Sequence, residues 1–328
     1  MLGLHQVAGN VCATRLVAGV ADTYFWSMTI DTNLRSVVAL RAHIPEDAFT
    51  ARTLGTVREG SGVVISDGGL VLTIGYLITE ATEVWLTTID GQVVAAHPLA
   101  YDQVTGFGIV QALGRLDLPA LELGDSDGVK IGDPVVFADG AGQTVTGSVI
   151  ARQEFAGYWE YLLDAALFVA PAHPSWGGAA LIDAEGNLLG IGSLRLQMIQ
   201  SGQVADINMV VPINLLKPIL NDMLTRGEPD RTPRPWLGVF SAETNGEVVV
   251  MNVADGGPAA EAGIRRGDII SDIRDSEVGG LADFYRKLWE IGPAGAEVPL
   301  RIVRDGRESW LRVKSTDRNQ LLSKPRLQ

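Results

Sequence analysis

Short apolar runs separated by turn sequences recur along the chain from Ser36 to about residue 191. Asp67-Gly68-Gly69 and Asp90-Gly91 each lie between two such runs, as the turns of β-hairpins do. The predicted strands are residues 37–42, 62–65, 70–73, 84–89, 92–96, 135–138, 144–150, 161–169, 179–182 and 188–191. Because no helical pattern interrupts them, this region is predicted to form a barrel or sandwich, and two six-stranded barrels would fit residues 36–211.

The pattern changes after Pro212, where apolar residues recur at helical spacing up to Leu224, and Gly227 is expected to end the helix. The next residues carry three prolines and four charges, as linkers do. Beyond them, strands are predicted at 248–253, 298–303 and 310–313, and a helix at 281–291. The predicted organisation is an N-terminal segment (1–35), a β-barrel region (36–226), a linker (227–235), a second domain (236–316) and a C-terminal tail (317–328).

Composition narrows the functional classes. The chain has 328 residues, enough for two or three domains, and is 46% hydrophobic, so it can bury a core. Its net charge of −13 argues against nucleic-acid binding, which needs clustered Lys and Arg. Cys12 is the single cysteine, which excludes an intrachain disulfide and a Cys-rich zinc site, and the four His show no metal-ligand spacing. We therefore predict no metal and no cofactor.

The termini and the compartment are less defined. No apolar run approaches the roughly 20 residues of a membrane-spanning helix, so no membrane span is predicted. The first 26 residues lack a Lys- or Arg-led start and an uninterrupted apolar core, so we predict no signal peptide. The compartment is left open.

Residues 236–314 resemble the PDZ domains that follow HtrA proteases. The matching stretches are Trp236-Leu237-Gly238-Val239, Gly257-Pro258-Ala259, Ala262-Gly263-Ile264 and Gly267-Asp268-Ile269-Ile270. The resemblance implies that backbone amides of the first stretch receive the terminal carboxylate of a peptide, which adds a strand beside the one starting at Val239 and packs on the 281–291 helix. The implied peptide-binding residues are Trp236, Leu237, Gly238, Val239, Phe240, Phe284 and Leu288. A PDZ domain that only packs against its neighbour is the alternative.

Residues 36–226 resemble the trypsin-like domain of the HtrA/DegP family, whose members are usually periplasmic. The supporting stretches are Gly60-Ser61-Gly62-Val63-Val64-Ile65, Gly124-Asp125-Ser126, Ile131-Gly132-Asp133-Pro134-Val135, Gly186-Asn187-Leu188-Leu189-Gly190-Ile191 and Val211-Pro212-Ile213-Asn214. The two resemblances together imply a mainly β protein, a trypsin-like double β-barrel followed by an α+β PDZ domain.

The resemblance also places the family's catalytic triad, and this sequence departs from it at each position. Tyr76 stands at the histidine position and Gly106 at the aspartate position, while Asp102 matches a non-catalytic aspartate. A phenol with a pKa near 10 is a poor general base at neutral pH. Trp176 stands at the serine position, and an indole is no nucleophile.

The oxyanion hole is also altered. Pro174 replaces a glycine whose N–H would line the hole, and proline has no N–H. A one-residue slip would offer Ser175 as the nucleophile, with His97 or His173 as candidate base. We expect instead that both histidines are surface or hydrogen-bonded imidazoles, and that Tyr76 and Trp176 fill the cleft or grip a peptide.

Three functional hypotheses follow. The first is a pseudoprotease that binds protein C-termini or unfolded peptides through its PDZ domain and its altered cleft. The second is an active serine endopeptidase that uses Ser175 with a histidine. The third is a scaffold whose PDZ domain recruits one partner.

The N-terminal segment carries one oligomerisation signal. Tyr24, Phe25 and Trp26 are consecutive in an otherwise irregular stretch, and exposed apolar patches of this kind often mark interfaces. A homotrimer is one expectation, since HtrA-like proteases commonly trimerise through aromatic residues before the first barrel. The alternative is that these side chains fold back onto their own barrel.

Overall fold

The computed structural model describes residues 33–200 and 202–323. Cys12 and the aromatic stretch Tyr24-Phe25-Trp26 lie outside these residues. Contacts divide the chain into two compact units, of which the first contains residues 33–153 and 165–229 and the second contains residues 154–164 and 230–323.

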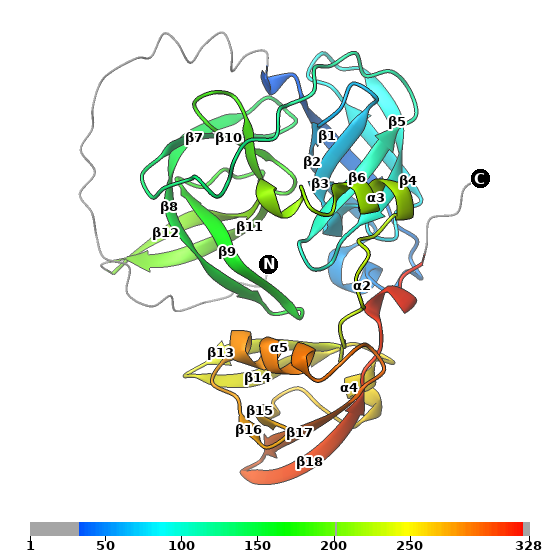
Figure 1. Ribbon diagram of the computed structural model, residues 1–328, viewed down its shortest axis with the longest axis vertical. Helices are drawn as coiled ribbons and strands as arrows, with labels where there is room; N and C mark the ends of the chain where they lie inside the picture. The colour runs from blue at the N-terminus through cyan, green and yellow to red at the C-terminus, as the bar shows by residue number, and fades with distance from the viewer. Residues whose placement is uncertain (1–32, 201, 324–328) are drawn as a thin grey trace. The chain divides into compact units, whose positions relative to one another are not determined.

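The first six strands of unit 1 form a closed barrel with the neighbour order β1-β2-β3-β6-β5-β4 (Figure 1). They are β1 (Val37–His43), β2 (Val57–Val64), β3 (Leu70–Ile74), β4 (Glu83–Thr87), β5 (Val93–Tyr101) and β6 (Phe107–Ala112). Buried and less buried residues alternate along β5, because successive side chains point to opposite faces of the sheet. A short helix α2 (Ala51–Leu54) and a 3-10 turn η1 (Gly75–Leu77) complete the barrel.

The second barrel closes in the order β10-β11-β12-β9-β8-β7. Its strands are β7 (Pro134–Ala138), β8 (Thr144–Gly157), β9 (Tyr161–Ala170), β10 (Ala180–Ile182), β11 (Leu188–Gln200) and β12 (Gln203–Pro212). Phe137, Leu167, Leu181 and Val210 belong to its buried core. The prediction of two six-stranded barrels is confirmed.

The helix predicted after Pro212 is wrong at its start. The structure has a 3-10 turn η2 (Ile213–Leu215), and the helix α3 begins only at Leu220 and runs to Arg226 (Leu220–Arg226). Pro218 explains the break, because it has no N–H to donate and disfavours helical backbone at the residue before it. The predicted end is correct: Gly227 caps α3 in the left-handed conformation, with φ of 80°.

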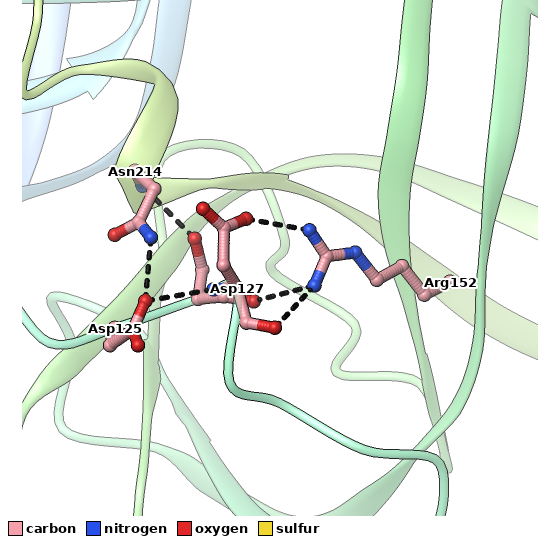
Figure 2. A network of polar contacts seen from close by, with 5 residues as sticks. Asp125, Asp127, Arg152 and Asn214 are labelled. Carbon is pink, nitrogen blue, oxygen red and sulfur yellow. Dashed lines mark hydrogen bonds and ion pairs between the residues drawn. The ribbon is translucent and has the colours of Figure 1, made fainter.

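A polar network joins the second barrel to the segment that follows it (Figure 2). The Asn214 side chain donates to Asp125 at 2.6 Å, and its backbone N–H donates to Ser126 Oγ at 3.0 Å. Arg152 of β8 binds the Asp127 carboxylate at 2.6 Å and the Asp127 carbonyl at 2.9 Å. Two sequence stretches that suggested the family resemblance, 124–126 and 211–214, therefore meet in one place.

Residues 230–323 of unit 2 form a sheet in the order β13-β14-β15-β17-β18, with β13 at an edge. The elements are β13 (Val239–Thr244), β14 (Glu247–Val253), α4 (Pro258–Glu261), β15 (Ile269–Ile273), β16 (Ser276–Glu277), α5 (Leu281–Glu290), β17 (Glu297–Arg304), β18 (Arg307–Lys314) and η3 (Arg318–Gln320). Helix α5 lies beside β13 and β14 (Figure 1) and buries Leu281, Phe284, Tyr285 and Leu288, which share one face at spacings of three and four residues.

Candidate functional sites

The cleft between the two barrels of unit 1 is partly filled by an aromatic pair. Tyr76 lies on η1, directly after β3, and its hydroxyl donates to the Ser193 carbonyl at 3.0 Å. The Trp176 side chain acts on the same hydroxyl and favours its ionised form. Burial raises the pKa of Tyr76, against the smaller opposing effect of Trp176, so the phenol is neutral at neutral pH.

Beside this pair an open cleft of about 620 Å³ remains. Pro174, Ser175 and Trp176 line one part of it, and Arg41 and Glu59 another. The loop that carries Trp176 is fixed against β2, because the Ser61 N–H donates to the Gly177 carbonyl at 2.8 Å. The cleft therefore has room for an extended chain, with Tyr76 and Trp176 in its lining.

Gly106 lies next to the η1 turn but brings no carboxylate to it. Its carbonyl accepts the Gly75 N–H at 2.7 Å, and its φ of 84° favours glycine at this position. The Asp102 carboxylate accepts from the N–H and the hydroxyl of Thr105, at 3.0 and 2.6 Å, so it shapes the turn before β6.

Ser175 and His173 are neighbours, but the contact between them uses the serine backbone. His173 Nδ1 accepts the Ser175 N–H at 3.0 Å, and the other ring nitrogen lies 3.1 Å from the Gln143 carbonyl. This pairing makes Nε2 the donor and occupies the lone pair of Nδ1. His97 lies on β5, opposite Gln111 of β6, and neither histidine lines the cleft.

A different site appears in unit 2, where one carboxylate meets three consecutive backbone amides. Oε1 of Glu160 accepts from the N–H groups of Leu237, Gly238 and Val239 at 3.2, 2.7 and 3.0 Å. The second oxygen lies 3.1 Å from the Leu237 nitrogen, and Glu160 is 4% exposed. The loop before β13 is therefore built to hold a carboxylate, in the way that backbone nests hold anions.

The hairpin tip that carries Glu160, residues 154–164, also contacts β13 and α5. The Ser241 N–H of β13 donates to the Tyr158 carbonyl at 2.9 Å, and the rings of Phe240 and Tyr158 lie 6.2 Å apart. Leu162 is 9% exposed and belongs to the same buried cluster as Phe284 and Leu288.

Helix α5 adds polar contacts to the same hairpin tip. Tyr285 Oη donates to the Gly157 carbonyl at 2.8 Å and accepts the Glu160 N–H at 3.2 Å. Arg286 pairs with Glu154 and, at 2.7 Å, with Asp164. Trp236 is buried at 5% exposure, and its backbone pairs with Thr316.

Two properties of Glu160 are unusual. Burial raises its pKa to about 7, despite the opposing hydrogen bonds from Leu237, Val239 and Gly238 and the charge of Arg318. Its φ of 58° places a residue with a side chain in the left-handed region, a conformation that costs on the order of 1–3 kcal/mol when the surroundings impose it.

Within residues 33–200 and 202–323, no group of three or more His, Cys, Asp or Glu side chains is arranged to hold a metal ion. In the same residues, no helix combines the length and apolar character needed to cross a membrane.

The two regions match known families. Residues 60–191 match the profile of the trypsin-like peptidase domain, and residues 235–314 match that of the PDZ domain. The periplasmic serine endoprotease DegP of Escherichia coli K12 is 27% identical over 271 residues, which cover 76% of this chain and 55% of DegP. The serine protease Do-like HtrA of Bacillus subtilis is 24% identical over 293 residues, covering 80% of this chain and 65% of the relative. The chain thus spans little more than half the length of the first of these relatives.

Solved structures give the same fold. The HtrA-type protease AlgW with a decapeptide aligns with a TM-score of 0.53 at 21% identity, covering 92% of this chain and 99% of AlgW. A serine endoprotease from Yersinia pestis aligns with a TM-score of 0.52 at 21% identity, covering 91% and 99%.

The barrels and the sheet of unit 2 therefore define a trypsin-like peptidase domain followed by a PDZ domain, and the predicted fold class is confirmed. The homologues of the chain are the DegP/HtrA serine proteases.

The sequence-based prediction of the site lacked Glu160, Leu162, Tyr158 and Tyr285. One local signal was present: the turn Tyr158-Trp159-Glu160 contains no Gly, Asn or Asp, although a hairpin turn of this kind favours them.

Proposed function

We propose that this protein is a non-catalytic HtrA-like protein that binds protein C-termini or unfolded peptides through its PDZ domain. The cleft beside Tyr76 and Trp176 offers a second surface for an extended peptide. The observation that carries the proposal is the set of three amides at Leu237, Gly238 and Val239, which converge on one carboxylate.

Four substitutions support the absence of proteolysis. The resemblance places Tyr76, Gly106 and Trp176 at the triad positions and Pro174 at an oxyanion position, and none of the four supplies the required group. A serine endopeptidase that uses Ser175 with a histidine is the alternative. The occupied Nδ1 of His173 argues against that pairing, since a general base must accept the hydroxyl proton.

Peptide binding is tested on the full chain by fluorescence polarisation. The probe is a labelled hexapeptide, Gly-Ser-Gly-Tyr-Trp-Leu, with a free C-terminal carboxylate, and the control is the same peptide with an amidated C-terminus. Hydrogen bonds to a charged acceptor contribute about 1.5–3 kcal/mol, so we expect the free acid to bind at least about tenfold more tightly than the amide.

The ligand-side control is preferable to a substitution in the loop. Gly238 has φ of 78°, and a Cβ there would lie 2.8 Å from the Trp236 ring, so a side chain at this position would disturb the fold itself. Equal affinity for acid and amide would reject the carboxylate loop as a C-terminus site. A free-acid peptide array with other C-terminal residues extends the same comparison.

A further inference from the structure

We propose that the hairpin tip at residues 154–164 is a built-in pseudo-ligand of the PDZ groove, so that a C-terminal peptide binds only by displacing Glu160. This inference rests on the proposed function, since it concerns the regulation of the same site.

The first support is the register of the hairpin on β13. In peptide addition to a sheet edge, alternate residues of the ligand pair with the edge strand. Glu160 brings a carboxylate to the loop before β13, and the residue two positions earlier, Tyr158, accepts the Ser241 N–H at 2.9 Å. The hairpin therefore occupies both the carboxylate position and the strand position that a C-terminal peptide would use.

The second support is the division of the ligand's features between two residues. A C-terminal residue carries its carboxylate and its side chain on one Cα atom. Here Glu160 supplies the carboxylate, and Leu162 supplies an aliphatic side chain to the cluster that includes Leu237, Phe284 and Leu288. An external peptide that ends in an aliphatic residue offers both features at once and is the class of ligand that competes.

The third support is the preorganisation of the tip. Trp159 stacks on Tyr161 with ring centroids 5.2 Å apart, and Phe155 lies 6.4 Å from each of these two rings. A rigid segment loses little entropy when it binds. Glu160 is held at a φ of 58°, a strained conformation that the contacts of its side chain and of Tyr285 maintain.

Two variants test whether Glu160 keeps the PDZ groove closed. Glu160→Gln keeps the size of the side chain and removes its charge, and Glu160→Gly removes the side chain at a φ that glycine adopts readily. Glu185→Gln is the matched control, because Glu185 is exposed in the turn between β10 and β11. We expect Glu160→Gly to bind the free-acid hexapeptide at least about tenfold more tightly than the wild type, since apparent affinity scales with the fraction of open groove. Glu160→Gln resembles the protonated side chain and should leave the groove closed, so it is expected to bind no more tightly than the wild type does at pH 5. The control should bind as the wild type does.

The outcomes separate the two proposals. If wild type and Glu160→Gly bind the peptide equally, the closed groove is wrong and the proposed function stands. If none of them binds any peptide of the array, the proposed function fails. Hydrogen exchange still tests the closed groove without a ligand: the amides of Leu237, Gly238 and Val239 should exchange faster in Glu160→Gly than in Glu185→Gln. Equal exchange would overturn it.

The closure should also depend on pH. The buried Glu160 has a pKa of about 7, whereas a released glutamate has one near 4.3, so protonation favours the closed groove. Raising the pH from 5 to 8 is therefore expected to strengthen peptide binding by the wild type by up to about 80-fold, the limit that these two pKa values set. The charged or titratable groups around Glu160 are Tyr285 and Arg318, with Arg286, Glu154 and Asp164 at the base of the tip.

No histidine occurs in residues 154–164 or 230–323, which isolates the titration of Glu160 in this pH range. The C-terminal carboxylate of the hexapeptide stays ionised above pH 5. In Glu160→Gln the affinity should be the same at pH 5 and pH 8. A wild type with the same flat profile, or a variant with the same slope, would contradict this prediction.

Discussion

The purified 328-residue chain is expected to leave unfolded casein intact over a day. Loss of triad members lowers the rate of a serine protease by roughly 10⁴–10⁶-fold. Removal of a single oxyanion-hole donor alone lowers the rate of a serine protease by roughly 10²–10³-fold. The family resemblance implies four substitutions, at residues 76, 106, 174 and 176, that would act on both parts of this machinery.

The measurement is gel analysis of casein together with labelling by a fluorophosphonate probe. Ser175→Ala is the control, because Ser175 is the hydroxyl nearest to the expected nucleophile position in the sequence. Cleavage by the wild type that disappears in Ser175→Ala would establish an endopeptidase with displaced residues and overturn the proposal. Cleavage that persists unchanged in Ser175→Ala would not come from this serine.

The barrels and the PDZ sheet could be predicted because their signals are local. Asp90-Gly91 between two apolar runs specifies a hairpin from the few residues that form it, and Gly91 indeed adopts φ of 85°. The break before α3 could also have been predicted, since Pro218 interrupts the helical spacing. The apolar residues keep helical spacing on both sides of Pro218, and for this reason the predicted helix began too early.

The closed PDZ groove could not be predicted in the same way. Glu160 and the loop at Leu237 are 77 residues apart, and nothing near Glu160 in the sequence identifies its partners. The resemblance to PDZ domains implied a carboxylate at Leu237–Val239, but it gave no reason to seek that carboxylate within the chain. Only the three-dimensional arrangement shows that the hairpin tip belongs to the same compact unit as the PDZ sheet.

The role of His173 likewise depends on a nonlocal arrangement. Its backbone N–H donates to the Asn208 side chain at 2.6 Å, and its ring lies 5.6 Å from Phe137 in the second barrel. In the sequence, a histidine two residues before a serine resembles a catalytic pair. In the fold it is a fully buried, hydrogen-bonded imidazole, one of the two outcomes expected for it.

Arg58→Met is expected to destabilise the first barrel by about 3–5 kcal/mol, the cost of leaving a buried charge without its partner. Arg58 is 4% exposed and donates to the carbonyls of Tyr76 and Thr79 at 2.7 and 3.0 Å. It also donates to Thr50 Oγ1 at 2.7 Å, and that hydroxyl donates at 2.6 Å to Glu80.

The charged side chain of Arg58 therefore helps to hold the turn that carries Tyr76. Burial lowers the pKa of Arg58 to about 10, against the opposing effect of Glu80, so the guanidinium stays charged at neutral pH. Methionine keeps much of the side-chain volume. It removes the positive charge near the Glu80 carboxylate and the N–H donors of the Tyr76 and Thr79 carbonyls.

Arg41→Met is the matched control on the neighbouring strand β1. Arg41 pairs with Glu59 at 3.6 Å, and both side chains are more than half exposed, so the change should cost less than about 1 kcal/mol. Unfolding is followed by hydrogen exchange of the β1–β6 amides in urea, because the chain contains two compact units and a single transition would mix them. If Arg58→Met lowers the free energy of unfolding of the first barrel no more than Arg41→Met does, the guanidinium is not needed to hold the turn. If Arg58→Met destabilises the barrel strongly and adding Glu80→Gln restores part of the stability, the uncompensated carboxylate of Glu80 is the source of the instability.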